Sequence, residues 1–298
     1  MAGVDILTSV PLTFVGADGD TQHAPLVVGR VGGLETLLVL DTGSEVHLLT
    51  KELVDRLELT VADGEEGTDH SGATMPSWTV EDVGLFVGEH ELTLRDVVAI
   101  PAPKPFPGWG VGGILSPQQL HPSAWTVVDL VGDELLLVEG GDAAVAAWLE
   151  DRSPALTTLT LERDQAFPSV VVSAAISPHP ELPTMLNTGG RHTEFSGDAV
   201  PGVVVGAAPE RLGGGVSGVD VLGVKAGRAT LIVAEHDVPV ESLAVRTSMH
   251  EPHGLVGMDV LRGTVLAVCA EVGRPVLWQI PFGRGGGAES GSAAADVG

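Results

Sequence analysis

Two short segments of the chain carry nearly the same residues and could place two functional groups in one site. Residues 36–44 read TLLVLDTGS and residues 182–190 read LPTMLNTGG. Asp41 ends the first apolar run and Asn187 ends the second. A carboxylate can accept and return a proton, whereas a neutral amide only donates and accepts hydrogen bonds. The pair therefore predicts acid–base chemistry that depends on a single carboxylate.

A second pair of motifs follows the first pair in the same order. GILSPQQL begins at Gly113 and GLVGMDVL begins at Gly254, at nearly equal distances from Asp41 and Asn187. Each motif precedes an apolar segment that starts with Thr-Val. Two motifs repeated in order and spacing predict an internal duplication of the chain.

The elements that must position these motifs are mostly β-strands. Short apolar runs, many with period-two alternation, are bounded by Gly, Pro and Asp, a pattern that predicts strands joined by tight turns. Helices are predicted only over 50–59, capped by Thr50, and over 142–152. We therefore expect an all-β fold with two pseudo-symmetric lobes, residues 1–148 and 149–282. The tail 283–298 lacks an apolar pattern and is predicted to be disordered.

The order of these motifs resembles that of the aspartic peptidases over about residues 10 to 281. The two-lobed organisation is similar to pepsin, while the short lobes and GLVGMDVL are more similar to the retroviral type. The resemblance implies a cleft between the lobes, spanned by flap hairpins, with residues 41 and 187 facing each other across a pseudo-twofold axis. In the family, two carboxylates share one proton and exchange the roles of general base and general acid.

The resemblance also implies roles for the residues around the two turns. The supporting turn residues are Thr42, Gly43, Ser44, Thr188 and Gly189. The two threonines are expected to brace the turns by reciprocal hydrogen bonds, and the two glycines to leave room for close backbone approach. Residues 114–116 and 255–257 are expected to pack beneath the turns.

Further residues are candidates for the cleft or the flaps. The chain contains no tyrosine, so Trp78 either replaces the flap tyrosine of the family or is an ordinary core residue. The Gly-rich segment 211–223 predicts either a second flap hairpin or a simple turn. Glu45 and Arg191 each lie four residues beyond the key position, as a cross-lobe ion pair or as two solvated charges.

Two histidines near the turns have alternative interpretations as well. His47 and His192 either line the cleft or have structural roles beside the turns. Neither motif pair contains a set of metal ligands, and we predict no metal and no cofactor. His250 and His253 lie in MHEPHG without a partner cluster, which disfavours a metal site there.

Asn187 is the departure from the family pattern, and it leaves three functional hypotheses. An amide donor beside Asp41 favours the charged carboxylate and cannot act as the second acid. The first hypothesis is an enzyme that uses Asp41 as a lone general acid/base, assisted by Asn187, on a peptide or small molecule. The second is an inactive pseudoprotease that binds or inhibits peptides. The third is a true endopeptidase that regains a carboxylate by dimerisation or from Asp198 or Asp220.

Composition excludes several other classes of function. The formal net charge is -25, which opposes binding to nucleic acid. No apolar window is long enough to span a membrane and no signal peptide is visible, so we expect a cytoplasmic monomer, with a homodimer as the alternative. The segment GWGVGG at 108–113 follows a proline-rich stretch and precedes no predicted helix, which disfavours dinucleotide binding. Cys269 lies in a predicted buried strand and is expected to be structural.

Overall fold

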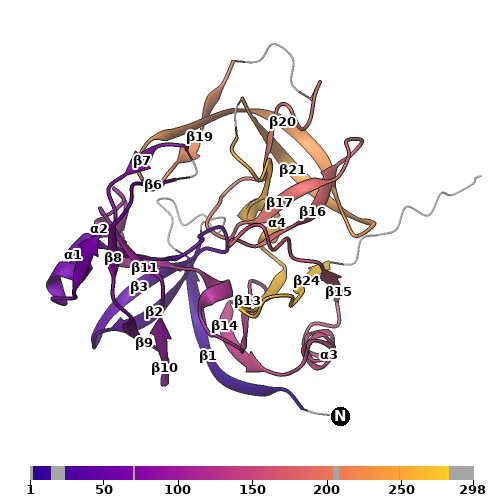
Figure 1. The fold of residues 1–298 in the computed structure, drawn as a ribbon. Coiled ribbons are helices and arrows are strands. Elements are labelled where there is room, and N and C mark those ends of the chain that lie inside the picture. Colours follow the sequence, from indigo (N-terminus) through magenta and orange to yellow (C-terminus); the bar gives the residue numbers. More distant parts are fainter. Residues whose placement is uncertain (1–2, 15–23, 70, 204–207, 248, 282–298) are drawn as a thin grey trace, which may run out of the picture.

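The computed structural model describes residues 3–14, 24–69, 71–203, 208–247 and 249–281. Within these residues strands dominate and the helices are short, which confirms the predicted all-β class (Figure 1). The predicted disordered tail, 283–298, lies outside the described residues. No helix among the described residues is long and apolar enough to cross a membrane.

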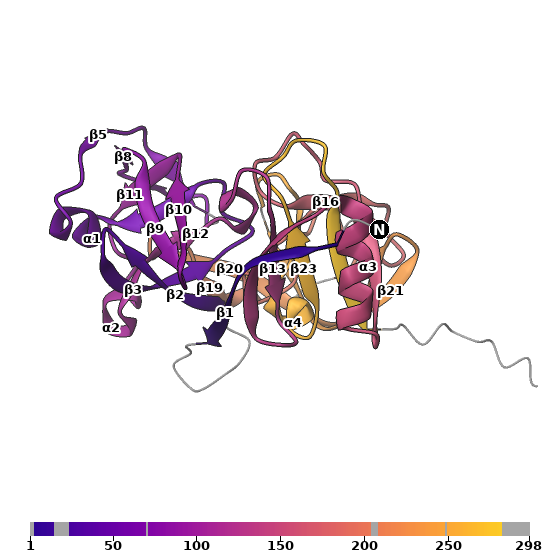
Figure 2. The same ribbon diagram turned by 90° about the horizontal axis from the view of Figure 1, so that it is seen from below.

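The larger sheet joins strands from both halves of the chain. In spatial order its main path is β15 (Leu156–Leu161), β24 (Val276–Pro281), β23 (Val265–Val268), β13 (Trp125–Asp129), β14 (Glu134–Glu139), β1 (Asp5–Phe14), β2 (Pro25–Val31), β3 (Leu34–Leu40), β12 (Val111–Leu115), β4 (His47–Thr50), β11 (Val97–Ile100), β8 (Trp78–Val80) and β5 (Val61–Asp63). Beside this path lie β9 (Val83–Val87) and β10 (His90–Leu94), with β9 paired to β2. Figure 2 shows β1 running between the two sides of the molecule, where it pairs with β2 at one end and β14 at the other.

A second sheet belongs entirely to the C-terminal half. Its order is β16 (Val171–Ile176), β17 (Leu182–Leu186), β22 (Gly254–Val256), β18 (Glu194–Ser196), β21 (His236–Arg246), β20 (Asp220–Val233) and β19 (Glu210–Gly214). A small hairpin of β6 (Gly67–Thr68) and β7 (Thr74–Met75) forms a third sheet.

The same strand arrangement occurs around both motif pairs. β12 lies parallel to β3 and antiparallel to β4, and β4 lies parallel to β11. In the second half, β22 lies parallel to β17 and antiparallel to β18, and β18 lies parallel to β21. This correspondence supports the inferred duplication. The division at residue 148 stays a prediction, and it falls inside α3 (Asp142–Arg152).

Both predicted helices are present. α1 (Lys51–Arg56) begins after Thr50, whose side chain accepts the Leu53 N–H, so the predicted cap is confirmed. It ends earlier than predicted, and Glu58 just beyond it has a positive φ of 53°. Three short elements were not predicted: α2 (Phe106–Trp109), α4 (Met258–Leu261) and the 3-10 helix η1 (Pro117–Gln119). Each lasts about one turn, which is too short to produce a periodic apolar pattern.

The largest apolar cluster contains residues from both halves. Leu40 and Leu115, which precede and support the first turn, are fully buried in it together with Leu186 and Val256 from the second. Because one core holds both strand ends, the two turns that follow them are fixed relative to each other. Cys269 directly follows β23 and is buried, as expected for a structural thiol.

Candidate functional site

The first turn holds Asp41 at the end of β3. The Asp41 N–H donates to the Leu115 carbonyl over 2.9 Å, which ties the turn to β12. The Ser44 N–H donates to the Asp41 carbonyl over 3.1 Å. The Gly43 N–H donates to Asp41 Oδ1 over 2.8 Å and so orients the half-buried carboxylate. One of its two oxygens is therefore engaged by its own turn.

The second turn repeats this arrangement around Asn187. The Asn187 N–H donates to the Val256 carbonyl over 2.9 Å, as Asp41 does to Leu115. Asn187 Oδ1 accepts N–H groups from Gly189 over 2.8 Å and from Gly190 over 2.9 Å. Because two backbone donors converge on Oδ1, the hydrogen-bond network places the amide Nδ2 group at the other end of the side chain. The turn therefore presents a donor where an aspartate would present an oxygen.

Thr42 and Thr188 lock the two turns together. The Thr42 N–H donates to Thr188 Oγ1 over 3.1 Å, and the Thr188 N–H donates to Thr42 Oγ1 over 3.0 Å. Each hydroxyl then donates to the strand of the other half: Thr42 to the Leu186 carbonyl at 2.5 Å, and Thr188 to the Leu40 carbonyl at 2.7 Å. Both threonines are fully buried, so this network has no competing water and is costly to break.

Gly43 and Gly189 bring the two key side chains close to the opposite turn. A Cβ atom added at Gly43 would lie 2.7 Å from Asn187 Nδ2. A Cβ added at Gly189 would overlap the carboxyl group of Asp41. Asp41 therefore packs on the second turn and Asn187 on the first. Only glycine leaves room for this approach.

Of the two locations considered for His47, lining the cleft or lying beside the turn, the structure places it beside the turn. The side chain is fully buried beneath the first turn, where Nδ1 accepts the Ser116 N–H over 3.2 Å. Nε2 lies 3.4 Å from the Gln119 carbonyl, so the network assigns the proton to Nε2. Burial lowers the pKa of His47 to about 4, and the Gln119 hydrogen bond opposes this only in part. His47 is therefore neutral, and its ring connects the first turn to the segment that follows β12 through these two backbone contacts.

Thr193 takes the corresponding position in the second half. Its Oγ1 accepts the Gly257 N–H over 3.2 Å and donates to Asp259 Oδ1 over 2.7 Å. Burial raises the pKa of Asp259, although the Thr193 hydrogen bonds oppose the shift. His192 is half-buried, and burial lowers its pKa while Asp259 acts in the opposite direction. His192 thus lies near enough to Asp259 for the two side chains to interact electrostatically, and its role in the cleft stays a prediction.

Gln118 supports the first turn and was not predicted. Its Nε2 donates to the Ser44 carbonyl over 2.8 Å, and Ser116 Oγ donates to the same carbonyl over 2.9 Å. The signal lay in the repeat: aligning GILSPQQL with GLVGMDVL pairs Gln118 with Asp259. Ser44 itself donates its hydroxyl to the Val46 carbonyl over 2.7 Å.

The remaining predicted site residues are described by the contacts that they make. Trp78 is on β8, where its ring centroid lies 5.5 Å from Lys51 Nζ of α1 and its side chain packs on the main core. Glu45 is exposed, and its carbonyl accepts a hydrogen bond from the Gln119 side chain. The Arg191 carbonyl accepts the Asp259 N–H over 3.1 Å. The ion pair between Glu45 and Arg191 stays a prediction, as does the flap role of Trp78.

The two acids considered as replacements for the second carboxylate lie in exposed positions. Asp220 is on β20, where its Oδ1 accepts from Arg211 Nε over 2.6 Å. Asp198 is exposed in the turn after β18. The place opposite Asp41 belongs to Asn187 and its turn. The hypothesis that Asp198 or Asp220 supplies a second carboxylate stays a prediction.

Packing explains the glycines of the GWGVGG segment. Gly112 and Gly113 of GWGVGG lie in β12, where an added Cβ would overlap the Thr36 hydroxyl or the Leu48 carbonyl. In the described part of the chain, no group of three or more His, Cys, Asp or Glu side chains could hold a metal ion. His250 and His253 are both exposed.

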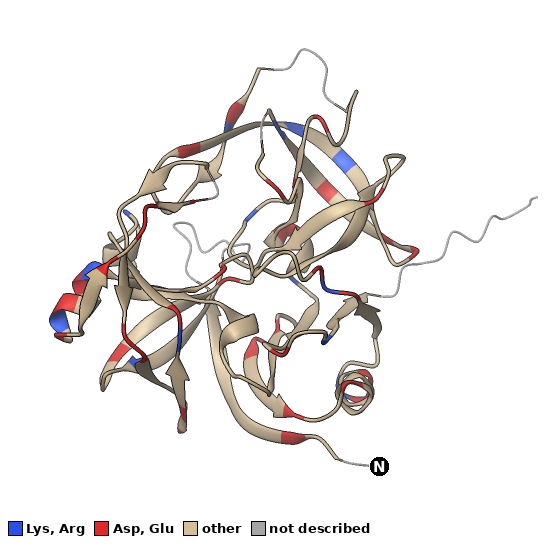
Figure 3. Ribbon diagram, in the orientation of Figure 1, with Lys and Arg blue, Asp and Glu red and all other residues tan. Residues whose placement is uncertain are grey.

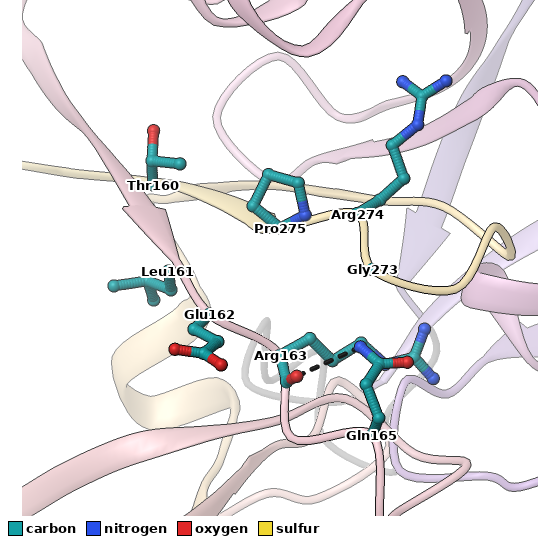
Figure 4. A pocket seen from close by; sticks show the side chains of 8 residues that line it. All are labelled: Thr160, Leu161, Glu162, Arg163, Gln165, Gly273, Arg274 and Pro275. Carbon is teal, nitrogen blue, oxygen red and sulfur yellow. Dashed lines mark hydrogen bonds between the residues drawn. The ribbon is translucent and has the colours of Figure 1, made fainter.

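A surface pocket of about 380 Å³ lies between residues 160–165 and 273–275 (Figure 4). It is lined by Thr160, Leu161, Glu162, Arg163, Gln165, Gly273, Arg274 and Pro275. The Arg163 guanidinium donates to the carbonyls of Pro168 over 2.5 Å and Cys269 over 3.3 Å. Arg274 pairs with Asp142 and Glu271, so both arginines have structural partners.

Comparison with known proteins supports the relationship suggested by the first turn. Residues 27–116 match a family model described as aspartyl protease. This segment runs from β2 through Asp41 to Ser116, and so includes the first turn and its supporting strand. The chain therefore contains an aspartic-protease-like domain. A comparison with curated proteins gave no match.

Proposed function

We propose that the protein is an enzyme that uses Asp41 as a lone general acid/base, with the Asn187 amide as a hydrogen-bond donor. The observation that supports this most is the intact lock between Thr42 and Thr188, which holds an acceptor and a donor at equivalent positions of two turns. A pair of that kind is complementary to a substrate group that must lose a proton beside an oxygen that gains negative charge.

The chemistry available to this pair differs from that of two carboxylates. Asp41 can take a proton from a bound water, hydroxyl or amide and return it later in the reaction. Asn187 can donate a hydrogen bond to a carbonyl oxygen but cannot protonate it. Peptide-bond hydrolysis needs protonation of the leaving nitrogen, which here falls to Asp41 alone. Proton transfer, rearrangement or cyclisation on a peptide or small molecule fits one carboxylate better.

The predicted partners belong to the same proposal. Acidic residues lie on strands, turns and helices of both halves in Figure 3, which favours a neutral or basic substrate over nucleic acid. A soluble cytoplasmic location and a monomeric state remain predictions from the sequence.

The test compares three forms of the full chain on one pool of peptides. Wild type, Asp41→Asn and Asn187→Asp are incubated at pH 4 and pH 7 with peptides from a digested proteome, and products are identified by mass spectrometry. We expect wild type to form products that are absent with Asp41→Asn, while both show the same thermal melt within a few degrees. Asn187→Asp, which restores two carboxylates, is expected to hydrolyse peptides at pH 4.

Two outcomes would overturn the proposal. Products formed equally by wild type and Asp41→Asn would remove Asp41 from the chemistry. No product with wild type, together with hydrolysis by Asn187→Asp, would favour the pseudoprotease hypothesis, because the site would then bind peptides and lack only the second acid.

A further inference from the structure

The half-buried guanidinium of Arg163 lies where two surface pockets meet. The pocket of about 380 Å³ in Figure 4 shares Glu162, Arg163 and Gln165 with a neighbouring pocket of about 500 Å³. In Figure 4 Arg163 and Gln165 lie on one side of the first pocket, and Pro275 lies on the other. A ligand in either pocket would therefore meet the same cationic side chain.

Arg163 carries a positive charge that no carboxylate pairs with in the described part of the chain. Its guanidinium has five N–H groups, of which one donates to the Pro168 carbonyl and one to the Cys269 carbonyl. Its Nε is buried and meets no hydrogen-bond partner among the described residues. Burial lowers the pKa of Arg163, because the guanidinium gives up solvation that the neighbouring carbonyls replace only in part. Arg274 in the same pocket pairs with two carboxylates, so Arg163 is the cation that an anionic ligand would neutralise.

The surroundings of Arg163 favour a singly charged anion with an apolar part. Glu162 lines both pockets, Asp164 lines the second, and the formal net charge of the chain is -25. A doubly charged phosphate would meet stronger repulsion there than a carboxylate does. Apolar side chains line the pockets on both sides of the guanidinium: Leu161, Pro275, Val172, Leu182 and Pro183. A carboxylate attached to a small aliphatic group matches both the charge and the lining.

The hydrogen bonds of Arg163 continue to the first turn. The Pro168 carbonyl accepts from Arg163 and also, over 3.4 Å, from Nε2 of Gln118, the residue that supports this turn. Two residues further along the chain, the Val170 N–H donates to the Thr42 carbonyl over 3.1 Å. A ligand held by Arg163 would therefore contact a side chain that shares a hydrogen-bond partner with the support of the first turn.

We propose that Arg163 anchors a binding site for a small aliphatic carboxylate at the junction of the two pockets. One N–H group on each terminal nitrogen of the guanidinium remains to donate to the carboxylate, and the aliphatic group lies on the apolar lining. The residues that line the pockets include none of the two turns. An effect of this ligand on catalysis rests on the proposed function, whereas the binding itself does not.

The experiment measures binding of N-acetyl-leucine to the full chain by NMR, with N-acetyl-leucinamide as a neutral probe of nearly the same shape. Titrations at pH 7 and physiological salt follow the backbone amide signals of Gln165 and Gly273, which line the first pocket. We expect saturable shifts with the acid and binding about tenfold weaker or more with the amide, because only the acid carries a charge for Arg163. 4-Methylpentanoate, which lacks the acetamido group, distinguishes the sources of the carboxylate. Equal affinity supports a free aliphatic acid as ligand, and weaker binding than N-acetyl-leucine supports the carboxyl terminus of a peptide.

Three variants test the role of the charge. Arg163→Gln is expected to weaken binding of N-acetyl-leucine about tenfold or more, and Glu162→Gln to strengthen it severalfold because a repelling charge is removed. The matched control is Arg228→Gln, which removes the same charge from an exposed residue of β20 that pairs with Glu241. We expect unchanged affinity in this control. Thermal melts report whether each variant is folded, and Glu162→Gln, at an exposed position, tests the site even where Arg163→Gln fails to fold.

The site would be overturned by equal affinity for N-acetyl-leucine and N-acetyl-leucinamide. Unchanged binding in a folded Arg163→Gln protein, or an equal loss of affinity in Arg228→Gln, would also overturn it. None of these readouts uses turnover, so the carboxylate site can fail while the proposed function stands, and the reverse.

Discussion

The buried histidine beneath the first turn makes stability depend on pH in a defined window. His47 is neutral in the folded protein, with a pKa lowered from 6.5 to about 4 by burial. In the unfolded chain it titrates at its ordinary value. Between pH 6.5 and about 4 the unfolded state therefore binds more protons, and the free energy of unfolding falls as the pH falls. Above this window the contribution of His47 is constant.

The size of the effect follows from the same two values. Lowering the pH from 7 to 5 is expected to reduce the free energy of unfolding by about 2 kcal/mol through His47 alone. Other groups titrate over the same range, so the contribution of His47 must be isolated by a variant. His47→Asn keeps an acceptor in the place of Nδ1 for the Ser116 N–H and removes the titration.

Urea unfolding followed by tryptophan fluorescence gives the free energy at each pH, with Trp125 and Trp278 both fully buried in the folded protein. Measurements stop at pH 5, because the isoelectric point is near 4.5. His47→Asn is expected to be less stable at pH 7, since it loses ring packing, but to lose about 2 kcal/mol less than wild type on acidification. Parallel stability curves for the two proteins would refute the reasoning and would mean that His47 is protonated, or accessible to protons, in the folded state.

Three further outcomes are expected from the structure. Thr188→Val removes an acceptor for the Thr42 N–H and should lower the free energy of unfolding by about 2–4 kcal/mol in urea, whereas an effect below about 0.5 kcal/mol would contradict the proposed lock. Gly189→Ala should lower the melting temperature by several degrees because the new Cβ overlaps the opposite carboxyl group, while Gly84→Ala, where an added Cβ meets nothing within 4 Å, should have a much smaller effect. Cys269 is buried and burial raises its pKa, so its reaction with a thiol reagent should be about a hundredfold slower in native protein than in urea; fast native labelling would show that this region opens.

Local sequence signals predicted the features that depend on neighbouring residues. The Thr50 cap and the helix over 142–152 follow from short-range hydrogen bonds and propensity, and both are present. The short strands follow from apolar runs between turn residues. The end of α1 was less accurate, because the chain leaves the helix through a positive φ at Glu58 that no nearby glycine signals.

Contacts between distant segments determine the features that local sequence signals did not predict. The residues that flank His47 in the sequence do not show whether its side chain is buried or lines a cleft. Its position depends on the Ser116 N–H, which β12 brings beneath the turn. The Gly-rich segment 211–223 predicts either a second flap hairpin or a simple turn, and only the fold brings Ser217 to Asp69. Gln118 has no local pattern, and its role becomes visible when the carbonyl of Ser44 lies next to it.

The all-β class, the repeated turns and the presence of one carboxylate and one amide at equivalent positions could all be predicted from the sequence. These depend on residue type and order, which need no knowledge of packing. The fold was needed to show that Thr42 and Thr188 form reciprocal hydrogen bonds and that Asp41 packs on the turn of Asn187. It was also needed to show that a hairpin from the other half, formed by β19 and β20, lies against the strands that carry Asp41. The reason is physical: each of these contacts joins groups far apart along the chain, and only burial in one shared core holds them within hydrogen-bonding distance.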